Sequence, residues 1–340
     1  MIKKFFFGIA VTIALLNTNA NAGSSKMIDV FKNNPVFSLQ ISAVGCGAYE
    51  FRINDAPIYG DLNGVPIDTT FPIDEWMISG NNSMSIIVAP ESANDAQISI
   101  QSGQQCVVSA TLQVRPNGTP ESENMLISTL KYSAIPNNLT TLEANLIGST
   151  PVGKYNSSES FKQDNKDGDV TLDKITITSQ DTKNGSGVII TRQLQLPQLP
   201  FPKWTWLNGE ILSDNDATRE DLYKQYQNIF DAIKSNNLKP LAPLFQIKKD
   251  ESAAAYYSTP DQFDQFAALA GDASNNQMQF GGVVPYKYTK LKVFGNGKLA
   301  KLVASWDGGT LIFFNYKDGS ANVSYDLTFS KINGKWVIVR

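Results

Sequence analysis

Histidine, the side chain most often used for proton transfer near neutral pH, is absent from all 340 residues of the chain. Its absence excludes the Ser-His-Asp and Cys-His nucleophile systems, zinc sites with histidine ligands and histidine acid–base catalysis. Carboxylates, lysine and tyrosine remain as possible catalytic groups, but no recognisable motif brings them together. We therefore assign no catalytic residue, and the sequence favours a protein that is not an enzyme.

The two cysteines, Cys46 and Cys106, are the other candidates for chemistry. An even pair in an oxidising compartment indicates a disulfide, whereas a redox-active pair usually has the closer Cys-x-x-Cys spacing. The bond would close a loop of about sixty residues and stabilise the fold by roughly 4 kcal/mol on the chain-entropy model. We predict that both cysteines lie on strands with their Cα atoms about 5.5 Å apart. A pair of free buried thiols is the alternative.

One acidic run, residues 164–169, has the composition of a calcium loop. Aligning Gly168 with loop position six puts Gln163 at position one and Lys174 at position twelve, where Asp and Glu are required. The run therefore predicts a hairpin turn, with an adventitious calcium site as the alternative, and we predict no metal site. Glycine-rich phosphate-binding motifs are also missing from the sequence, so no cofactor is predicted.

The N-terminus has the three parts of a secretory signal. Lys3 and Lys4 form the basic region, Phe5 to Leu16 the apolar core, and Ala20-Asn21-Ala22 the cleavage site. We expect a signal peptide over residues 1–22 and a periplasmic or secreted protein, with an uncleaved anchor as the alternative. Removing the two lysines from the 29 basic residues leaves 27 against 32 acidic ones. The basic residues are scattered, which argues against binding to nucleic acid or to an anionic membrane.

Residues 27–196 show the pattern of short strands separated by turns. Apolar and polar residues alternate in eight runs, and turn sequences such as Asn63-Gly64 and Asn184-Gly185 lie between them. This pattern predicts an all-β, antiparallel sandwich domain. The predicted strands are Phe37–Ala43, Tyr49–Ile53, Met84–Val88, Ile98–Ile100, Val107–Val114, Met125–Tyr132, Val170–Ile177 and Val188–Leu196.

Part of this region resembles jelly-roll-like sandwich domains. The resemblance rests on Ile53 to Ile58 and on Phe71 to Asn82, where a strand is followed by a polar loop, Gly-Asn and a second strand. It implies a domain that binds sugars or serves as a structural accessory. Because sugar rings stack on exposed aromatic side chains, the candidate ligand-binding residues are Tyr49, Tyr59 and Trp76.

Residues 197–215 are the predicted linker. Three prolines within six residues remove backbone donors and hold the chain extended. Trp204 and Trp206 follow with strand spacing. We expect both to face one side of a strand and to pack at the contact between the two domains.

Residues 216–340 have helical periodicity first and strands afterwards. Thr218 and Asp221 form a capping box, and apolar residues follow with helical spacing from Leu222 to Ile233. Strand-like runs joined by Asn-Gly and Asp-Gly turns come next. The order predicts an α+β domain in which helices pack on one antiparallel meander sheet. The predicted strands are Leu291–Phe294, Lys298–Trp306, Thr310–Lys317, Asn322–Phe329 and Lys335–Val339.

The order is similar to that of NTF2-like and cystatin-like domains. The segment from Phe230 to Phe245 and the closing segment from Gly334 to Arg340 carry the resemblance. It implies helices that cross a curved sheet and a cone-shaped cavity between them. The tyrosines that could line such a cone are Tyr256, Tyr257, Tyr286 and Tyr288.

From these observations we expect an exported, non-enzymatic binding protein that engages a protein partner. An immunity or inhibitor protein, or an accessory of an envelope complex, would fit. The acidic net charge would suit a basic partner through electrostatic steering. Carbohydrate or peptidoglycan binding by the N-terminal sandwich is one alternative, and a small-molecule reaction in the C-terminal cone is another.

Overall fold

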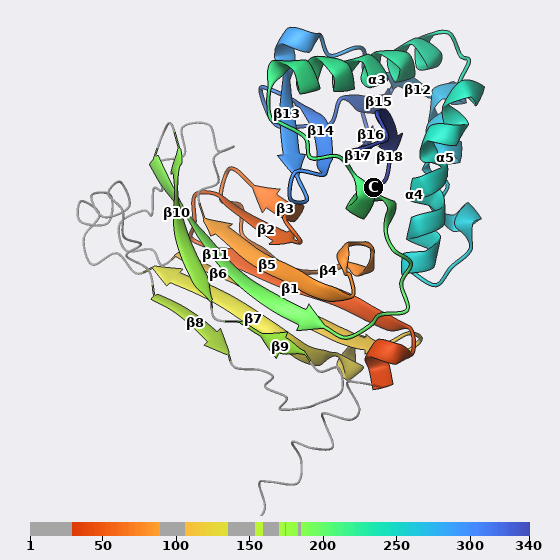
Figure 1. Cartoon of the computed structure of the whole chain (residues 1–340). Helices are drawn as coiled ribbons and strands as arrows, with labels where there is room; N and C mark the ends of the chain where they lie inside the picture. Colours follow the sequence, from red (N-terminus) through yellow and green to blue (C-terminus); the bar gives the residue numbers. More distant parts are fainter. Residues whose placement is uncertain (1–28, 89–105, 135–153, 159–169, 174, 183–184) are drawn as a thin grey trace, which may run out of the picture.

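The computed structural model describes residues 29–88, 106–134, 154–158, 170–173, 175–182 and 185–340 (Figure 1). Antiparallel strands make up most of the regular structure, and the longer helices follow the N-terminal strands in the chain. The prediction of a mixed fold dominated by antiparallel sheets is confirmed. The expected signal peptide, the strand at Ile98–Ile100 and the acidic run at residues 164–169 lie outside the described residues.

The N-terminal strands form two antiparallel sheets. The first has the strand order β4 (Ile67–Pro72), β1 (Pro35–Val44), β6 (Cys106–Pro116), β7 (Met125–Ala134) and β8 (Lys154–Ser158). The second has the order β10 (Thr176–Thr182), β11 (Gly185–Leu196), β5 (Gly80–Val88), β2 (Tyr49–Ile53) and β3 (Ala56–Asp61), with β9 (Thr171–Leu172) beside β11. The predicted strand at Val170–Ile177 is divided between β9 and β10, and β3, β4 and β8 were not predicted.

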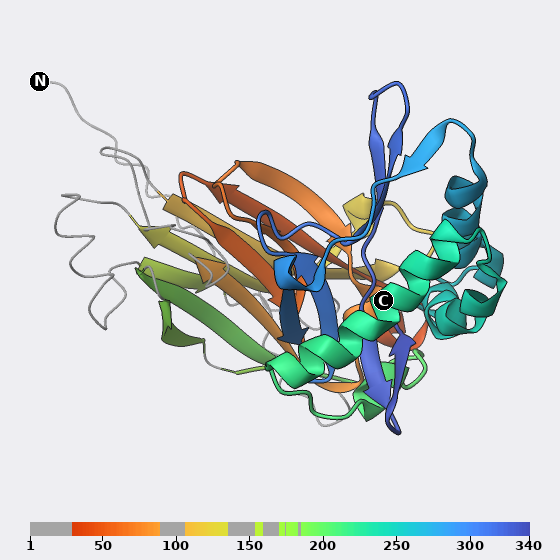
Figure 2. The same cartoon turned by 90° about the horizontal axis from the view of Figure 1, so that it is seen from above.

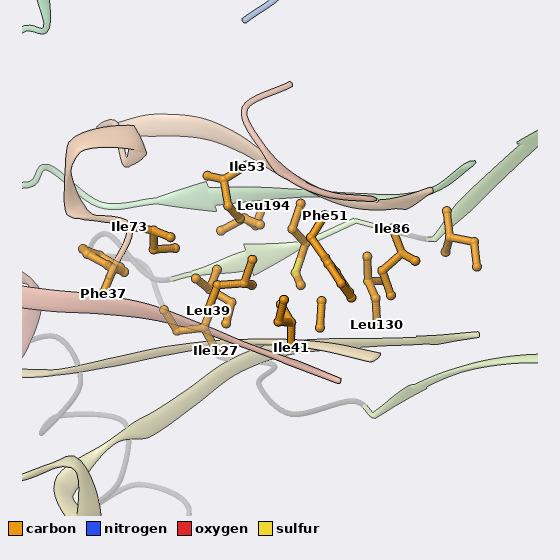
Figure 3. Packing of buried hydrophobic residues seen from close by; sticks show 14 of the residues in the cluster. Phe37, Leu39, Ile41, Phe51, Ile53, Ile73, Ile86, Ile127, Leu130 and Leu194 are labelled. Atoms are coloured by element: carbon orange, nitrogen blue, oxygen red, sulfur yellow. The ribbon is translucent and has the colours of Figure 1, made fainter. Parts of the chain in front are cut away.

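Alternation along these strands builds one hydrophobic cluster from both sheets. In β1, Phe37, Leu39 and Ile41 are buried at every second position. They meet Phe51 of β2 and Leu130 of β7 in the same cluster (Figure 3). Because successive side chains of a strand point to opposite faces, the period-two pattern of the sequence puts these residues on the inward face.

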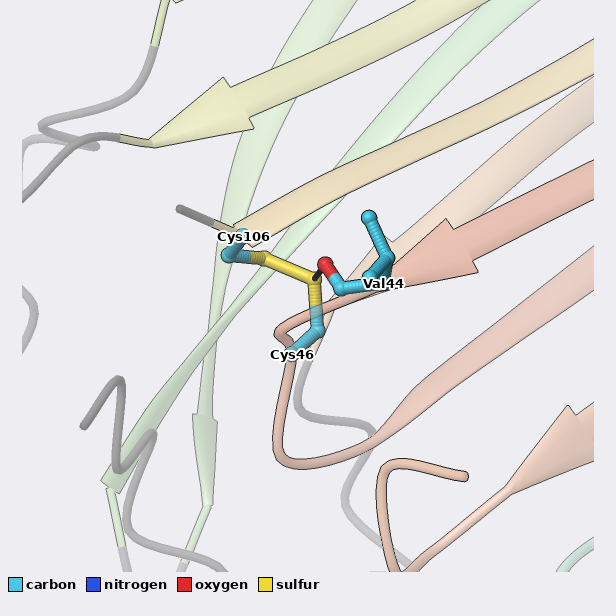
Figure 4. Close-up of a disulfide and its surroundings, with 3 residues drawn as sticks. All are labelled: Val44, Cys46 and Cys106. Carbon is cyan, nitrogen blue, oxygen red and sulfur yellow. Dashed lines mark hydrogen bonds between the residues drawn. A yellow bond between two sulfur atoms is a disulfide. The ribbon is translucent and has the colours of Figure 1, made fainter. Parts of the chain in front are cut away.

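The disulfide between Cys46 and Cys106 is present, with 4.6 Å between the two Cα atoms (Figure 4). Cys106 is the first residue of β6, as expected for a strand cysteine. Cys46 lies in the loop between β1 and β2, so the prediction that both cysteines lie on strands was wrong. Gly45 has a φ of 71°, and this left-handed conformation turns the chain out of β1 just before Cys46.

Residues 197–215 connect the N-terminal sheets to the rest of the chain. Trp204 and Trp206 are buried together, as predicted, but Trp206 lies in the 3₁₀ turn η3 (Thr205–Asn208) and neither tryptophan lies on a strand. The indole of Trp204 donates a hydrogen bond to the carbonyl of Met77, at 2.7 Å. The two rings share a hydrophobic cluster with Ala56, from the N-terminal part, and with Val339, near the end of the chain.

Three helices follow, and α3 (Asp216–Lys234) confirms the helix that the apolar stripe predicted. Its buried residues include Leu222, Phe230 and Ile233, which confirms the helical periodicity. The predicted capping box was wrong, because Asn215 caps the helix by accepting the Thr218 amide at 2.9 Å. The other helices are α4 (Ala242–Ala255) and α5 (Gln265–Ser274), and the remaining short turns are η1 (Asp74–Trp76), η2 (Glu121–Glu123), η4 (Lys239–Leu241), η5 (Pro260–Phe263) and η6 (Tyr286–Tyr288).

The C-terminal strands form two sheets and not one meander. One sheet has the order β12 (Met278–Phe280), β15 (Ile312–Tyr316) and β16 (Asn322–Tyr325), and the other β13 (Thr289–Phe294), β14 (Leu299–Ala304), β17 (Phe329–Ile332) and β18 (Lys335–Ile338). The predicted strand Asn322–Phe329 is divided between the two sheets. At the start of the second part, the Thr328 amide donates to the carbonyl of Arg340 at 2.8 Å, just before β17 and just after β18.

The helix α3 runs across the C-terminal strands, with the N-terminal strands to one side (Figure 2). Its aromatic residues Tyr226 and Phe230 pack into a second hydrophobic cluster with Phe314 and Phe329 from the two C-terminal sheets. Among the described residues, every helix is too short or too polar to cross a membrane.

Candidate functional site

The candidate site is a groove of about 370 Å³ between the β2–β3 hairpin and the β13–β14 hairpin. The two hairpins are far apart in the sequence. In the view of Figure 1, β13 and β14 lie above β2 and β3. The volume lies in the range of sites that hold a small ligand or a short peptide segment. The groove is lined by Glu50, Arg52, Pro57, Gly60, Leu62, Asp214, Lys290, Leu291, Lys292, Val293, Phe294, Lys301, Val303, Asp307 and Gly308.

The tips of the two hairpins touch and fix one end of the groove. Asp55, in the β2–β3 turn, accepts the Asn296 amide on its carboxylate at 2.9 Å and the Gly295 amide on its carbonyl at 3.3 Å. Asn54, Asp55, Gly295 and Asn296 all have positive φ values. These residue types adopt the left-handed conformation at low cost, so the local sequence supports both tight turns.

A row of lysines lines the C-terminal wall of the groove. In β13 the residues Thr289 and Leu291 are buried, whereas Lys290 is exposed and Lys292 partly exposed. Lys301 of β14 is directly opposite Lys292 and pairs with Asp326 at 2.5 Å. The alternation of β13 thus puts Lys290 and Lys292 on one face, beside the Lys301 pair.

The facing wall, from β2, carries charges that are already paired. Arg52 donates to Glu50 and, at 2.7 Å, to Asp55. Burial lowers the pKa of Arg52, but the two carboxylates outweigh this effect and raise the pKa above its ordinary value. The guanidinium therefore stays charged, and it holds both carboxylates in place.

Two large aromatic side chains are exposed close to the lysine row. Tyr288 is 44% exposed and Trp306 57%, and their ring centroids lie 6.1 Å apart in an edge-to-face arrangement. The Tyr288 carbonyl accepts the Ser305 amide at 2.8 Å, which ties the two segments together. Lys287 lies over the Tyr288 ring, with its ammonium group 4.6 Å from the ring centroid. Trp306 immediately precedes Asp307 and Gly308 of the groove wall.

The structure brings two of the three predicted N-terminal ligand residues together. Tyr49 is buried, and its hydroxyl donates to the carbonyl of Val65. Its ring stacks on that of Tyr59, which in turn stacks on Phe71 with the centroids 5.5 Å apart. Trp76 lies elsewhere, under the guanidinium of Arg340 and 5.5 Å from it.

The four predicted C-terminal tyrosines separate into two groups. Tyr256 stacks on Phe263 after the end of α4, and the Tyr257 hydroxyl donates to the carbonyl of Pro35 at 2.9 Å. Tyr286 and Tyr288 lie before β13. The hydroxyl of Tyr286 accepts a hydrogen bond from Arg219 at 3.0 Å. None of the four is among the residues that line the groove, and the four do not line one cavity.

A second cluster of charged side chains is buried beside the two tryptophans. Arg340 is 4% exposed and donates to the carboxylate of Glu251 at 2.5 Å and to the carbonyl of Glu75 at 2.8 Å. The other carboxylate oxygen of Glu251 accepts the Thr205 amide at 2.5 Å. The guanidinium also lies 5.1 Å from the ring of Trp204. These contacts join α4, η3 and the residue after the last strand, Arg340, to η1.

Asp74, the first residue of η1, is fully buried as well. Its Oδ1 accepts the Phe37 amide at 2.7 Å, whereas its Oδ2 has no hydrogen-bond partner in the described part of the chain. Burial raises the pKa of Asp74 to about 8, against the opposing effect of the Phe37 hydrogen bond. Its carboxyl group is therefore largely protonated at neutral pH.

Sequence reasoning missed the groove, Trp306 and the lysine row. Every second position from 288 to 292 is occupied by Tyr288, Lys290 and Lys292, and this spacing could have been interpreted as one face of a strand. Which element lies opposite that face depends on contacts between hairpins more than 200 residues apart, and no local pattern encodes them.

Within the described residues, no group of three or more carboxylate or cysteine side chains could hold a metal ion. No protein-family model matches the chain, and no curated protein has significant sequence similarity to it.

Proposed function

We propose that this chain is an exported, periplasmic binding protein that engages a protein partner at the groove and its aromatic rim. An immunity or inhibitor protein, or an accessory of an envelope complex, would act in this way, because occlusion or docking requires no catalytic group. The signal sequence supports the location, and the disulfide suits an oxidising compartment.

The observation that carries the proposal is the exposed pair Tyr288 and Trp306 beside a groove rich in charged side chains. Tyrosine and tryptophan are enriched among the residues that dominate binding energy at protein interfaces. They bury much apolar area while fixing few side-chain torsions. A rim of charged residues around such a pair is the usual anatomy of a protein–protein contact.

We further propose two domains: a jelly-roll-like β-sandwich over residues 27–196 and an NTF2-like or cystatin-like α+β domain over residues 216–340. Separate hydrophobic clusters in the two regions support this division. The helix α3 across the C-terminal strands supports the second resemblance. Residues 197–215 would then be a packed connection more than a free linker, because Trp204 and Trp206 are buried.

Photo-cross-linking tests the binding proposal. Trp306 is replaced by p-benzoylphenylalanine in the full chain, which is then mixed with a periplasmic extract and irradiated. We expect a discrete cross-linked protein from this position. The same replacement at Leu126, an exposed apolar residue of β7 outside the groove, should give no such product. Equal products from both positions, or none from either, would contradict the proposal.

A further inference from the structure

A second groove, of about 560 Å³, lies where α3 ends and α4 begins. It shares no lining residue with the groove between the two hairpins. Its volume falls in the range of sites that hold a small ligand. Five of its nine lining residues are polar, so the ligand that it suits depends on how these side chains are placed and whether the fold uses them.

One side of α3 forms the first wall of this α3–α4 groove. Gln225, Asn228 and Ala232 follow one another at intervals of three and four residues, about one helical turn each. The buried stripe of the same helix, which includes Ile229 and Ile233, lies on another side. The packing of α3 onto the C-terminal sheets therefore leaves the amide side chains of Gln225 and Asn228 at the groove.

The turn at the end of α3 brings a third amide, that of Asn237, to the groove. The backbone N–H of Asn237 donates to the carbonyl of Ala232 at 2.9 Å, and that of Asn236 to the carbonyl of Ile233 at 3.1 Å. With Asn236 at a φ of 51°, these bonds form a Schellman turn. The position of Asn237 in such a turn often carries an apolar side chain that packs back on the helix, but Asn237 is exposed. The turn thus requires the backbone of Asn237 and not its side chain.

The fold makes little use of the polar side chains in this groove. In the described part of the chain, the side chains of Gln225, Asn228, Asp231 and Asn237 have neither a hydrogen bond nor an ion pair. Ser235 differs, because its hydroxyl donates to the carbonyl of Asp231 at 2.7 Å. Each amide offers an acceptor oxygen beside two N–H donors, whereas the Asp231 carboxylate only accepts. The groove therefore presents free donors and free acceptors together.

The other properties of the lining narrow the class of ligand. Asp231 is the single charged residue among the nine, so a phosphate or carboxylate group would meet no counter-charge there. None of the nine is aromatic, so a nucleobase would have no ring to stack on. Leu241, which is buried, and Leu244, which is partly buried, add an apolar surface. A ligand that is uncharged, rich in hydroxyl groups and apolar on one face matches all three properties.

We propose that the α3–α4 groove binds a neutral carbohydrate. Neighbouring hydroxyl groups of a sugar would pair with the oxygen and the N–H of one amide, and a further hydroxyl would donate to Asp231. The C–H groups of the sugar ring would lie against Leu241 and Leu244. The sequence suggested carbohydrate binding by the N-terminal sandwich, whereas this site lies on the helices. It is additional to the proposed contact with a protein partner.

The test titrates the full chain with three neutral sugars, maltotetraose, cellotetraose and chitotetraose, and follows the side-chain NH₂ signals by NMR. We expect at least one sugar to bind and to shift the signals of Gln225, Asn228 and Asn237. Acidic tetragalacturonate and end-blocked tetralysine are the comparison ligands. Neither should shift these signals at the same concentration, because the first has no counter-charge in the groove and the second meets only one carboxylate.

Two variants and a matched control locate the site. Asn228→Leu removes the donors and the acceptor at similar size, and Asp231→Ala removes the charged acceptor. Each should weaken sugar binding about tenfold, as expected for the loss of a hydrogen-bonding partner. Gln227→Leu is the control, because Gln227 is an exposed neighbour on α3 outside the groove lining. Leucine and alanine favour helices at least as well as the residues they replace, so α3 should stay folded in all three variants.

Three results would overturn the proposal. They are no binding of any of the three neutral sugars, equal weakening by Asn228→Leu and Gln227→Leu or by neither, and tighter binding of tetralysine than of every sugar. The cross-link at Trp306 does not depend on this groove. Its loss would therefore count against the protein contact alone, and the failure of either proposal can be recognised separately.

Discussion

Two of the contacts between the N-terminal sheets and the C-terminal part of the chain have opposite character. At the buried contact, Arg340 is 4% exposed, bonded to Glu251 and packed near Trp204. At the groove, the hairpin tips touch through Asp55 and Asn296, and Lys290 and Trp306 face solvent. Both places combine cations with aromatic rings, but only the first is closed. A closed contact fixes geometry, whereas an open one leaves interaction energy for a partner.

The buried contact should be broken most severely by Arg340→Met. Removal of the guanidinium leaves Glu251 charged and buried without its partner, and breaking a buried pair in this way costs about 3–5 kcal/mol. Chemical denaturation measures the loss. The double variant Arg340→Met/Glu251→Gln should recover much of the loss, because it removes the stranded charge. A double variant as unstable as the single one would show that the ion pair is not the source of the effect.

Loss of the disulfide should have the next largest effect. Replacing Cys46 and Cys106 by serine opens a loop with a sequence separation of 60, which should lower the free energy of unfolding by about 2–4 kcal/mol. We expect the N-terminal sheets to unfold first and the C-terminal strands to stay folded. Hydrogen exchange resolved by region checks this order. Uniform destabilisation of both regions would instead show that the buried contact couples them into one cooperative unit.

Asp74 should give stability an unusual dependence on pH. Its folded-state pKa of about 8 lies above the ordinary value of about 3.9, so between these values the folded state binds the proton that the unfolded state has released. The contribution of Asp74 is thus fully present below about pH 4 and is lost as the pH rises to about 8. Comparing Asp74→Asn with the wild type across this range isolates the effect. The variant should lack the decline, and parallel curves would refute the assignment.

Local patterns predicted the parts of this fold that local chemistry determines. The stripe from Leu222 to Ile233 defined α3 because burial of one helix face has a fixed period. The strand β3 was missed because Pro57 and Gly60 lower strand propensity, and pairing with β2 outweighs that preference. Asp221, predicted as a cap, instead accepts hydrogen bonds from Lys331 and Trp336.

The candidate site was less predictable than the fold, for a physical reason. The sequence around Trp306 does not predict that its side chain is exposed. The alternation of apolar residues in β14 continues up to Trp306, so the sequence predicted Trp306 as part of that strand. The contact between Asp55 and Asn296, which forms the groove, spans 241 positions of sequence. Such a contact depends on how two folded hairpins pack against each other. The local sequence of each hairpin specifies that hairpin but not the packing between the two.

Trp306→Ala should have the smallest effect on stability and a large one on binding. The side chain is 57% exposed, so the free energy of unfolding should change by less than about 0.5 kcal/mol. Its counterpart in the buried contact, Trp204→Ala, should cost about 3–5 kcal/mol, because that ring is fully buried.

Binding of the partner identified by cross-linking should weaken about thirtyfold in Trp306→Ala, as expected for an interface residue worth about 2 kcal/mol. Ile211→Ala, an exposed control outside the groove lining, should leave binding unchanged. If both exposed variants weaken binding equally, the partner does not distinguish the groove from the surrounding surface, and the contrast between the two contacts loses its functional meaning.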